Sequence, residues 1–325
     1  MGGEARCQGF YDGRDTRITQ SNPGSGGRTA EAIVRQKTMG NVSKGLMEVN
    51  AATLLLGFVA LFPKMIDLPP GQIIFGRCVV AAASLAIFFV ARRRLPRLTR
   101  RRDYAVVSLL GMMLATHWVF YFHAVQVSTV AVAIIALFTY PIITVLLEPL
   151  VFRTRIARAD VLTALAVLFG IFLMIPGFSI GSSAGQGVMW GVASAALYAA
   201  RNVFQKKYLT EVSSSAALLY QVSIGALVLL PFLPAGSGKE MMSWSLPLLA
   251  LGALFTALPH TLLLDSLRHL KAKTLGIVQS LQPAYGVVLA AIFLSEYPSM
   301  RTLAGGAMVV IAASYEFVKV RRAQV

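Results

Sequence analysis

Several polar side chains that could bind a solute interrupt long apolar stretches of this sequence. Arg77 lies within "IIFGRCVVAAASLAIFFV". Its guanidinium could receive a carboxylate, or its long stem could extend toward a polar boundary, and both interpretations remain open. His117 and Trp118 lie in "MLATHWVFYF", and His260 lies in "ALPHTLLL". A histidine in such a setting can bind substrate, carry a proton or hydrogen-bond a neighbouring helix.

A second set of candidates combines proline with hydrogen-bonding side chains. Its members lie in "FTYPIITVLL" and "QSLQPAYGVVL", and they are Tyr140, Pro141, Gln279, Gln282, Pro283 and Tyr285. A proline removes a backbone donor and kinks a helix, which can turn carbonyl oxygens toward a ligand. Gln279 and Gln282 are three residues apart and share a helical face. We predict that this set lines a polar cavity; hydrogen bonding between helices is the alternative.

The composition places these residues inside a membrane. Hydrophobic residues make up 56% of the 325 residues, charged residues only 14%, and the mean hydropathy is +0.66. Soluble domains carry about 25% charged residues. The apolar runs are continuous and about 20 residues long, which is typical of spanning helices and not of a barrel. We predict an all-α integral membrane protein with ten transmembrane helices over 46–66, 70–91, 104–126, 130–152, 160–176, 187–207, 213–233, 246–267, 274–295 and 300–319.

The basic residues predict the orientation. The net charge is +16 and "ARRRLPRLTRRRD" resembles a nucleic-acid patch, but its apolar flanks argue against nucleic-acid binding. With both termini cytoplasmic, 26 of the 30 Lys and Arg residues fall on the cytoplasmic side and three, including Lys64, on the other. Lys and Arg are retained in cytoplasmic loops. We therefore expect a protein of the cytoplasmic (inner) membrane, a monomer or homodimer, whose arginine loops touch anionic lipid headgroups.

Enzyme signatures are missing from the sequence. The two cysteines, Cys7 and Cys78, give no metal-site spacing, and no glycine-rich loop carries a P-loop Lys-Ser/Thr pair. We expect no catalytic residues, no metal and no cofactor. The acidic residues Glu48, Glu148 and Asp265 lie toward the cytoplasmic ends of their spans. Facilitated transport, exchange, or coupling through a histidine or a displaced carboxylate all remain open.

An internal repeat divides the chain. A shift of 142 residues aligns "KGLMEVNAATLLLGFVALFPK" with "QGVMWGVASAALYAARNVFQK", and pairs Pro141 with Pro283. We expect a disordered polar tail over 1–42, with Met39 as a plausible true start, and two five-helix repeats over 43–178 and 185–320. Five is odd, so the second half enters the membrane from the opposite side. Inverted repeats are typical of secondary transporters.

The quoted segments resemble those of the EamA-type drug/metabolite transporters. The resemblance covers residues 45–320 and is carried by "LLLGFVALFPKMIDLPPGQIIFGR", "ALFTYPIITVLLEPLVF" and "SLQPAYGVVLAAIFLSEYPSMRTLAGGAMVVIAA". The segment "LSEYPSMRTLAGG" is similar to the family's Glu-containing turn, whereas Thr154 occupies the equivalent place in the first half. The resemblance implies export or import of amino acids, metabolites or drugs.

Together these patterns predict an alternating-access carrier that exports a small metabolite, amino acid or drug-like solute. The alternative is a non-transporting membrane protein, either a lipid-substrate enzyme or a partner subunit. The candidate substrate-binding residues are Arg77, His117, Trp118, Tyr140, His260, Gln279, Gln282 and Tyr285. The candidate hinge and gate residues are Pro141, Pro283, Lys64 and Asp67, with Asp67 as an expected gate partner of Arg77.

Overall fold

The computed structural model describes residues 43–93, 96, 98, 100–153, 158–174, 179, 181–209, 211–266, 269–270, 275 and 278–322. The predicted tail over 1–42, Met39 included, and Thr154 lie outside these residues. The described residues contain helices and no β-strand. The prediction of an all-α fold is therefore confirmed for the part of the chain that the structure describes.

Helices lie at the positions predicted for membrane spans. The first helix covers residues 43–59. It is followed by α2 (Phe62–Met65), α3 (Pro70–Ala91), α4 (Arg101–Val127), α5 (Val130–Leu137), α6 (Tyr140–Phe152), α7 (Arg158–Met174), α8 (Ser183–Tyr208), α9 (Ser214–Leu229), η2 (Leu230–Phe232), α10 (Ser237–Ser243), α11 (Ser245–Leu249), η3 (Ala250–Ala257), α12 (Leu258–Ser266), α14 (Gln282–Leu294) and α15 (Met300–Arg322).

Six helical segments among the described residues are long and apolar enough to cross a membrane, and three shorter helices are apolar. The count of ten spans stays a prediction. The six cover Ser43–Met65, Pro70–Ala91, Arg101–Val127, Val130–Phe152, Ser215–Phe232 and Ser245–Leu263. Large apolar side chains are exposed on the outside of the bundle, such as Ile87, Leu162 and Ile292. Such faces suit contact with lipid, because lipid tails solvate them and water does not.

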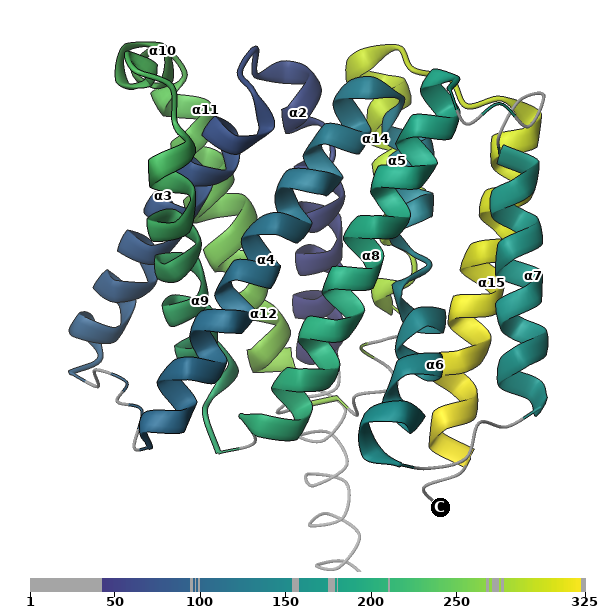
Figure 1. The fold of residues 1–325 in the computed structure, drawn as a ribbon, viewed down its shortest axis with the longest axis horizontal. Helices are drawn as coiled ribbons and strands as arrows, with labels where there is room; N and C mark the ends of the chain where they lie inside the picture. Colours follow the sequence, from purple (N-terminus) through teal and green to yellow (C-terminus); the bar gives the residue numbers. More distant parts are fainter. Residues whose placement is uncertain are drawn as a thin grey trace, which may run out of the picture. The chain divides into compact units, whose positions relative to one another are not determined.

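Helix boundaries recur at the 142-residue shift found in the sequence. Helices α6 and α14 are both 13 residues long and carry Pro141 and Pro283 in their first turns. Each ends at a residue with left-handed backbone, Arg153 (φ 57°) and Ser295 (φ 55°). In Figure 1, α6 lies toward the lower end of the bundle and α14 toward the upper end. These two helices thus share the same boundaries under the shift and lie toward opposite ends of the bundle.

The predicted proline kinks are breaks in the helices. The fourth predicted span divides into α5 and α6 at Phe138 and Thr139, and Pro141 follows in the first turn of α6. Proline is tolerated at this position because the first N–H groups of a helix have no partner within it. Pro283 occupies the same position in α14, after Leu281. Each proline therefore begins a second half-helix instead of bending a continuous one.

The two halves pack into each other along glycine-bearing helices. Helix α4 packs against α8 and α9, α3 against α9 and η3, and α5 against α8 and α14. Gly187 and Gly191 of α8 face α5, where an added Cβ would lie 2.1 Å from Ser128 Oγ and 2.6 Å from Ala136 Cβ. This G-x-x-x-G spacing lets two membrane helices approach closely. The main apolar core draws on both halves, and it surrounds the cavity described next.

Candidate functional site

A cavity of about 140 Å³ lies between the two halves. It brings together seven of the eight predicted substrate-binding residues, namely Arg77, His117, Trp118, Tyr140, His260, Gln279 and Gln282. The lining has three further polar members that were not predicted from the sequence, which are Tyr121, Tyr198 and Arg201. Apolar side chains complete it, among them Leu56, Val59, Leu114, Leu137 and Leu263. Among the described residues that line this cavity there is no Asp or Glu.

Most of the residues that line the cavity form pairs whose members are 142 positions apart in the sequence. Six pairs of lining residues are separated by that shift, which are Leu56 and Tyr198, Val59 and Arg201, Trp118 and His260, Tyr121 and Leu263, Leu137 and Gln279, and Tyr140 and Gln282. Residues that correspond in two inverted repeats face each other across the axis that relates the repeats. Corresponding positions of the two repeats therefore contribute to the same cavity.

Arg77 extends into the bundle and not toward a helix end. The residue is only 2% exposed, and its Nε donates a hydrogen bond of 2.8 Å to Thr256 Oγ1. Its guanidinium carbon lies 3.8 Å from the ring centroid of Trp118. Nη1 is buried and has no hydrogen-bond partner among the described residues. The Arg77 side chain therefore does not extend toward a polar boundary. The neutral groups around it leave part of its hydrogen-bonding capacity unused.

A local irregularity of the backbone presents Thr256 to Arg77. Thr256 lies in the π-helical segment η3, and its hydroxyl donates to Leu251 O at 2.6 Å, five residues back. The carbonyl oxygen of Thr256 lies 2.7 Å from Nδ1 of His260, and this hydrogen bond keeps the imidazole ring against its own helix. Single π-helical turns are frequent at functional sites because they alter the direction of side chains. The change of register cannot be read from the sequence.

His117 is tied to the second half through Ser194. The Ser194 hydroxyl donates to the His117 carbonyl at 2.8 Å, so His117 Nδ1–H can donate to Ser194 Oγ at 2.7 Å and to Ser194 O at 3.0 Å. The ring also stacks on Tyr198, with centroids 4.7 Å apart. Tyr198 in turn meets Tyr140 edge to face at 4.9 Å. These contacts fix the imidazole in the wall and use only Nδ1 among the described residues, which leaves Nε2 for a ligand.

Arg201 is a second guanidinium in the same cavity. It is one of the 26 Lys and Arg residues predicted to lie on the cytoplasmic side, but it lines the cavity from α8. Its Nε and Nη2 donate to Gln221 Oε1 at 2.9 and 2.7 Å, and Nη1 donates to Asn202 Oδ1 at 2.9 Å. All these acceptors are neutral amides. Arg201 lies six residues before the end of the predicted span 187–207, and this position within the span could have identified it as a candidate site residue.

Some of the residues around Pro283 line the cavity, and others contact neighbouring helices. Gln279 and Gln282 line the cavity, and Gln282 Nε2 also donates to Leu56 O at 3.4 Å. Tyr285 does not line it; its hydroxyl donates to Asn50 Oδ1 at 3.4 Å. The place predicted for Tyr285 is therefore corrected. One helical turn carries its ring past the cavity and onto the first helix, where Gly57 makes room for it.

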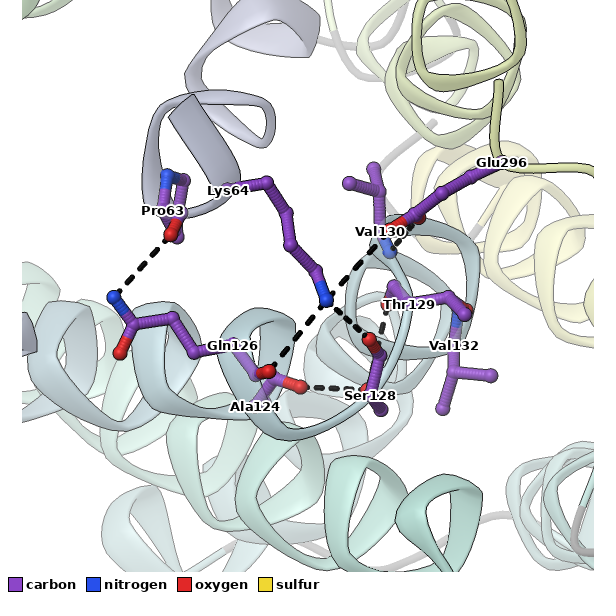
Figure 2. Close-up of polar contacts among 9 residues, drawn as sticks. All are labelled: Pro63, Lys64, Ala124, Gln126, Ser128, Thr129, Val130, Val132 and Glu296. Carbon is purple, nitrogen blue, oxygen red and sulfur yellow. Dashed lines mark hydrogen bonds and ion pairs between the residues drawn. The ribbon is translucent and has the colours of Figure 1, made fainter. Parts of the chain in front are cut away.

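Lys64 joins three helices at one end of the bundle (Figure 2). Its Nζ lies 3.7 Å from Glu296 Oε1 and donates to Ser128 O at 2.7 Å. The other carboxylate oxygen of Glu296 accepts from Val130 N at 2.9 Å, at the start of α5. A carboxylate is stabilised at a helix N-terminus by the free N–H groups and the helix dipole. We call this end of the bundle the Lys64 end.

A corresponding link lies at the opposite end. Lys206, the counterpart of Lys64 under the shift, forms an ion pair with Glu148 of α6. Its neighbour Lys207 donates to Val151 O at 2.9 Å. In Figure 1, α2 lies at the upper end and the C-terminal end of α8 at the lower end, which we call the Lys206 end. Each link connects the first helix of one half with the fourth helix of the other.

The predicted pair between Asp67 and Arg77 is not present. Asp67 is exposed in the loop after α2, whereas Arg77 is buried against Thr256 and Trp118. None of the ion pairs formed by the described residues involves either side chain. The turn of "DLPPG" begins α3 at Pro70, so seven residues of helix separate Arg77 from that loop.

The apolar helices, the inverted repeat and the central cavity define an integral membrane transport protein. Comparison with known proteins gives the particular family. The model of the EamA-like transporter family matches twice, over residues 43–175 and 185–315. The chain belongs to this family, as its sequence resemblance indicated.

Named relatives and solved structures agree with this assignment. The chain is 25% identical to the "Uncharacterized transporter YxxF" of Bacillus subtilis, over 86% of this chain and 91% of that one. It is 26% identical to the "Pseudopaline exporter CntI" of Pseudomonas aeruginosa, over 75% and 85%. It is 30% identical to the "Threonine/homoserine exporter RhtA" of Escherichia coli, over 70% and 72%. A crystal structure of a protein 19% identical in sequence shares the fold, with a TM-score of 0.55 over 87% of this chain and 99% of that one.

Proposed function

We propose that this protein is a secondary carrier that exports a small polar metabolite by alternating access. The observation that carries the proposal is the cavity, because its lining is built from pairs of residues related by the inverted repeat. A site on the axis between two such halves can face one side of the membrane and then the other. The exporter names of two relatives support the direction. The predicted orientation, with both termini cytoplasmic, belongs to the same proposal.

The two Lys–Glu links fit the gates that such a cycle needs. Lys64 and Glu296 hold the Lys64 end together, while Lys206 and Glu148 hold the Lys206 end. In alternating access one end opens while the other stays closed. We assign Lys64 to the gate on the side opposite the termini, and Pro141 and Pro283 to the hinges beside the cavity. Asp67 remains a proposed gate residue only through its loop, since it does not contact Arg77.

Counterflow in proteoliposomes tests the carrier function. The full chain is reconstituted, loaded with a high concentration of unlabelled L-threonine or L-homoserine, and supplied with trace labelled solute; a wider panel of metabolites follows. We expect saturable accumulation that unlabelled solute competes away. Leu137→Trp should abolish it by filling the cavity that Leu137 lines, whereas Leu162→Trp, at an exposed position of α7, should not. Flux that is absent for the whole panel, or unaffected by Leu137→Trp, would contradict the proposal.

A further inference from the structure

The cavity is lined by two guanidinium groups, and no acidic side chain is among its described lining residues. Arg77 and Arg201 both line it, and the described lining has no Asp or Glu. Arg77 contacts a hydroxyl and an indole ring, and Arg201 contacts two amide oxygens. A buried charge with only neutral partners is costly in a medium of low dielectric constant. A chain that keeps two such cations at one site gains most from a ligand that brings the missing negative charge.

The hydrogen-bonding capacity of the site points the same way. Nη1 of Arg77 and the hydroxyl of Tyr121 are buried and have no hydrogen-bond partner in the part of the chain that the structure describes. Nη1 can only donate, and the Tyr121 hydroxyl can donate or accept, so a hydrogen-bond acceptor would satisfy both groups. Arg presents a planar fork that matches a carboxylate, and hydrogen bonds between charged groups are stronger than neutral ones. The unsatisfied groups are therefore those that a carboxylate would satisfy.

The size and the remaining walls of the cavity restrict the rest of the ligand. Its volume of about 140 Å³ lies below the roughly 300–1,000 Å³ of sites for drug-sized ligands. Aromatic rings of Trp118, Tyr140 and Tyr198 form part of the wall, and Gln279 and Gln282 provide amide groups. Such walls accept a short apolar or hydroxyl-bearing side chain. They exclude a large multi-ring drug.

We propose that the transported solute is a small carboxylate-bearing metabolite, amino acids included, whose carboxylate binds between Arg77 and Arg201. This inference rests on the proposed carrier function, because it names the substrate class of that same cavity. The site then contains a second arginine, and it prefers small acids to neutral or drug-sized solutes. Arg77 supplies a planar fork of N–H donors beside Trp118, and Arg201 supplies a second positive charge from the other half of the chain.

Matched acids and amides test the charge requirement. The purified full chain is heated with millimolar L-threonine, succinate or benzoate, and separately with threoninamide, succinamide or benzamide, while its unfolding temperature is recorded. We expect at least one acid to raise that temperature and its amide not to. Arg77→Leu and Arg201→Leu should each weaken apparent affinity on the order of ten- to a hundredfold, the range for one hydrogen bond to a charged group. Arg77→Lys should retain part of the affinity, because charge remains but the fork is lost.

Controls and parallel flux measurements separate the two proposals. Arg301→Leu, at an exposed position of α15, should leave the acid effect unchanged. Acid binding that depends on both arginines, without counterflow, would leave the anion site standing and contradict the carrier. The anion site is wrong if amides bind as well as acids, if no acid in the panel stabilises the wild-type chain, or if Arg77→Leu and Arg201→Leu both respond like wild type.

Discussion

The ion pair between Lys64 and Glu296 gives the most direct prediction for the transport cycle. Glu296→Gln removes the negative charge but keeps an oxygen that can accept from Val130 N, now 2.9 Å from the carboxylate. The substitution therefore isolates the ion pair from the cap on α5. If this pair holds the Lys64 end closed, its loss should favour the conformation that is open at that end.

The size of the effect follows from distance and burial. Two unit charges near 4 Å attract by about 1 kcal/mol in water and about 4 kcal/mol at an effective dielectric constant of about 20. Here the charges are 3.7 Å apart, on side chains that are 27% and 22% exposed. Exposed pairs contribute only about 0–1 kcal/mol after desolvation and ordering. We therefore expect about 1–2 kcal/mol for this half-buried pair, which is roughly a five- to thirtyfold change in the ratio of open to closed molecules.

Access of a thiol reagent to the cavity measures that ratio. Leu137→Cys places a thiol in the lining, in a chain whose own Cys7 and Cys78 are replaced by serine. A membrane-impermeant reagent is applied to one side of the membrane and then to the other. Glu296→Gln should accelerate labelling from the Lys64 end about five- to thirtyfold. Glu148→Gln should accelerate it from the opposite end.

An exposed ion pair provides the matched control. Arg100 and Glu211 lie 3.4 Å apart, with side chains 65% and 72% exposed, so Glu211→Gln should leave both labelling rates unchanged. Exchange of the charges, Lys64→Glu with Glu296→Lys, should restore closure only in part, because a lysine cannot accept from Val130 N. Labelling of the Glu296→Gln chain at the wild-type rate, or accelerated equally from both sides, would refute the assignment of this pair as a gate.

Three further predictions test topology, hinges and packing. A fluorescent protein fused at Val325 should fluoresce and an alkaline phosphatase fused there should be inactive; the reverse result would contradict a cytoplasmic C-terminus. Pro141→Ala and Pro283→Ala should each lower counterflow per molecule more than they lower protein amount, because they permit continuous helices where the structure has breaks; equal flux per molecule would show that the prolines are not hinges. Gly191→Ala places a Cβ 2.6 Å from Ala136 Cβ and should cost about 1–3 kcal/mol of stability, seen as a lower unfolding temperature, whereas Gly71→Ala has nothing within 4 Å and should be neutral.

The sequence was sufficient to place individual helices. Helix α3 begins and ends where its apolar run does, at 70 and 91, because a membrane span needs a continuous run bounded by polar or proline-rich segments. The helix breaks were less predictable. Proline indicates where a hydrogen bond is lost, but whether the chain bends or divides into α5 and α6 depends on the helices packed around it.

The candidate site was predictable where one rule applied, that polar groups within a span are functional candidates. That rule found Arg77 and His117. It missed Arg201, because a basic residue near the end of a span was interpreted as a topological anchor beside Lys206. Thr256 could not be found at all, since its direction depends on the π-helical segment η3. The predicted gate pair of Asp67 with Arg77 was also wrong, because Arg77 is buried against Thr256 and Trp118. The ion pair at this end joins Lys64 to Glu296, which is distant in sequence.

The pairs of lining residues explain why the internal repeat indicates where the candidate site lies but not which solute it binds. Four of the six pairs join an apolar residue to a polar one, which are Leu56 and Tyr198, Val59 and Arg201, Leu137 and Gln279, and Leu263 and Tyr121. Helix boundaries such as those of α6 and α14 are repeated, while the side chains make the two walls of the cavity chemically different. The same division occurs at the ends, where the acidic partner of Lys206 is Glu148 and does not occupy the position equivalent to Glu296. Solute preference can therefore change through side chains at these positions, without altering the glycine contacts on which the packing of the halves depends.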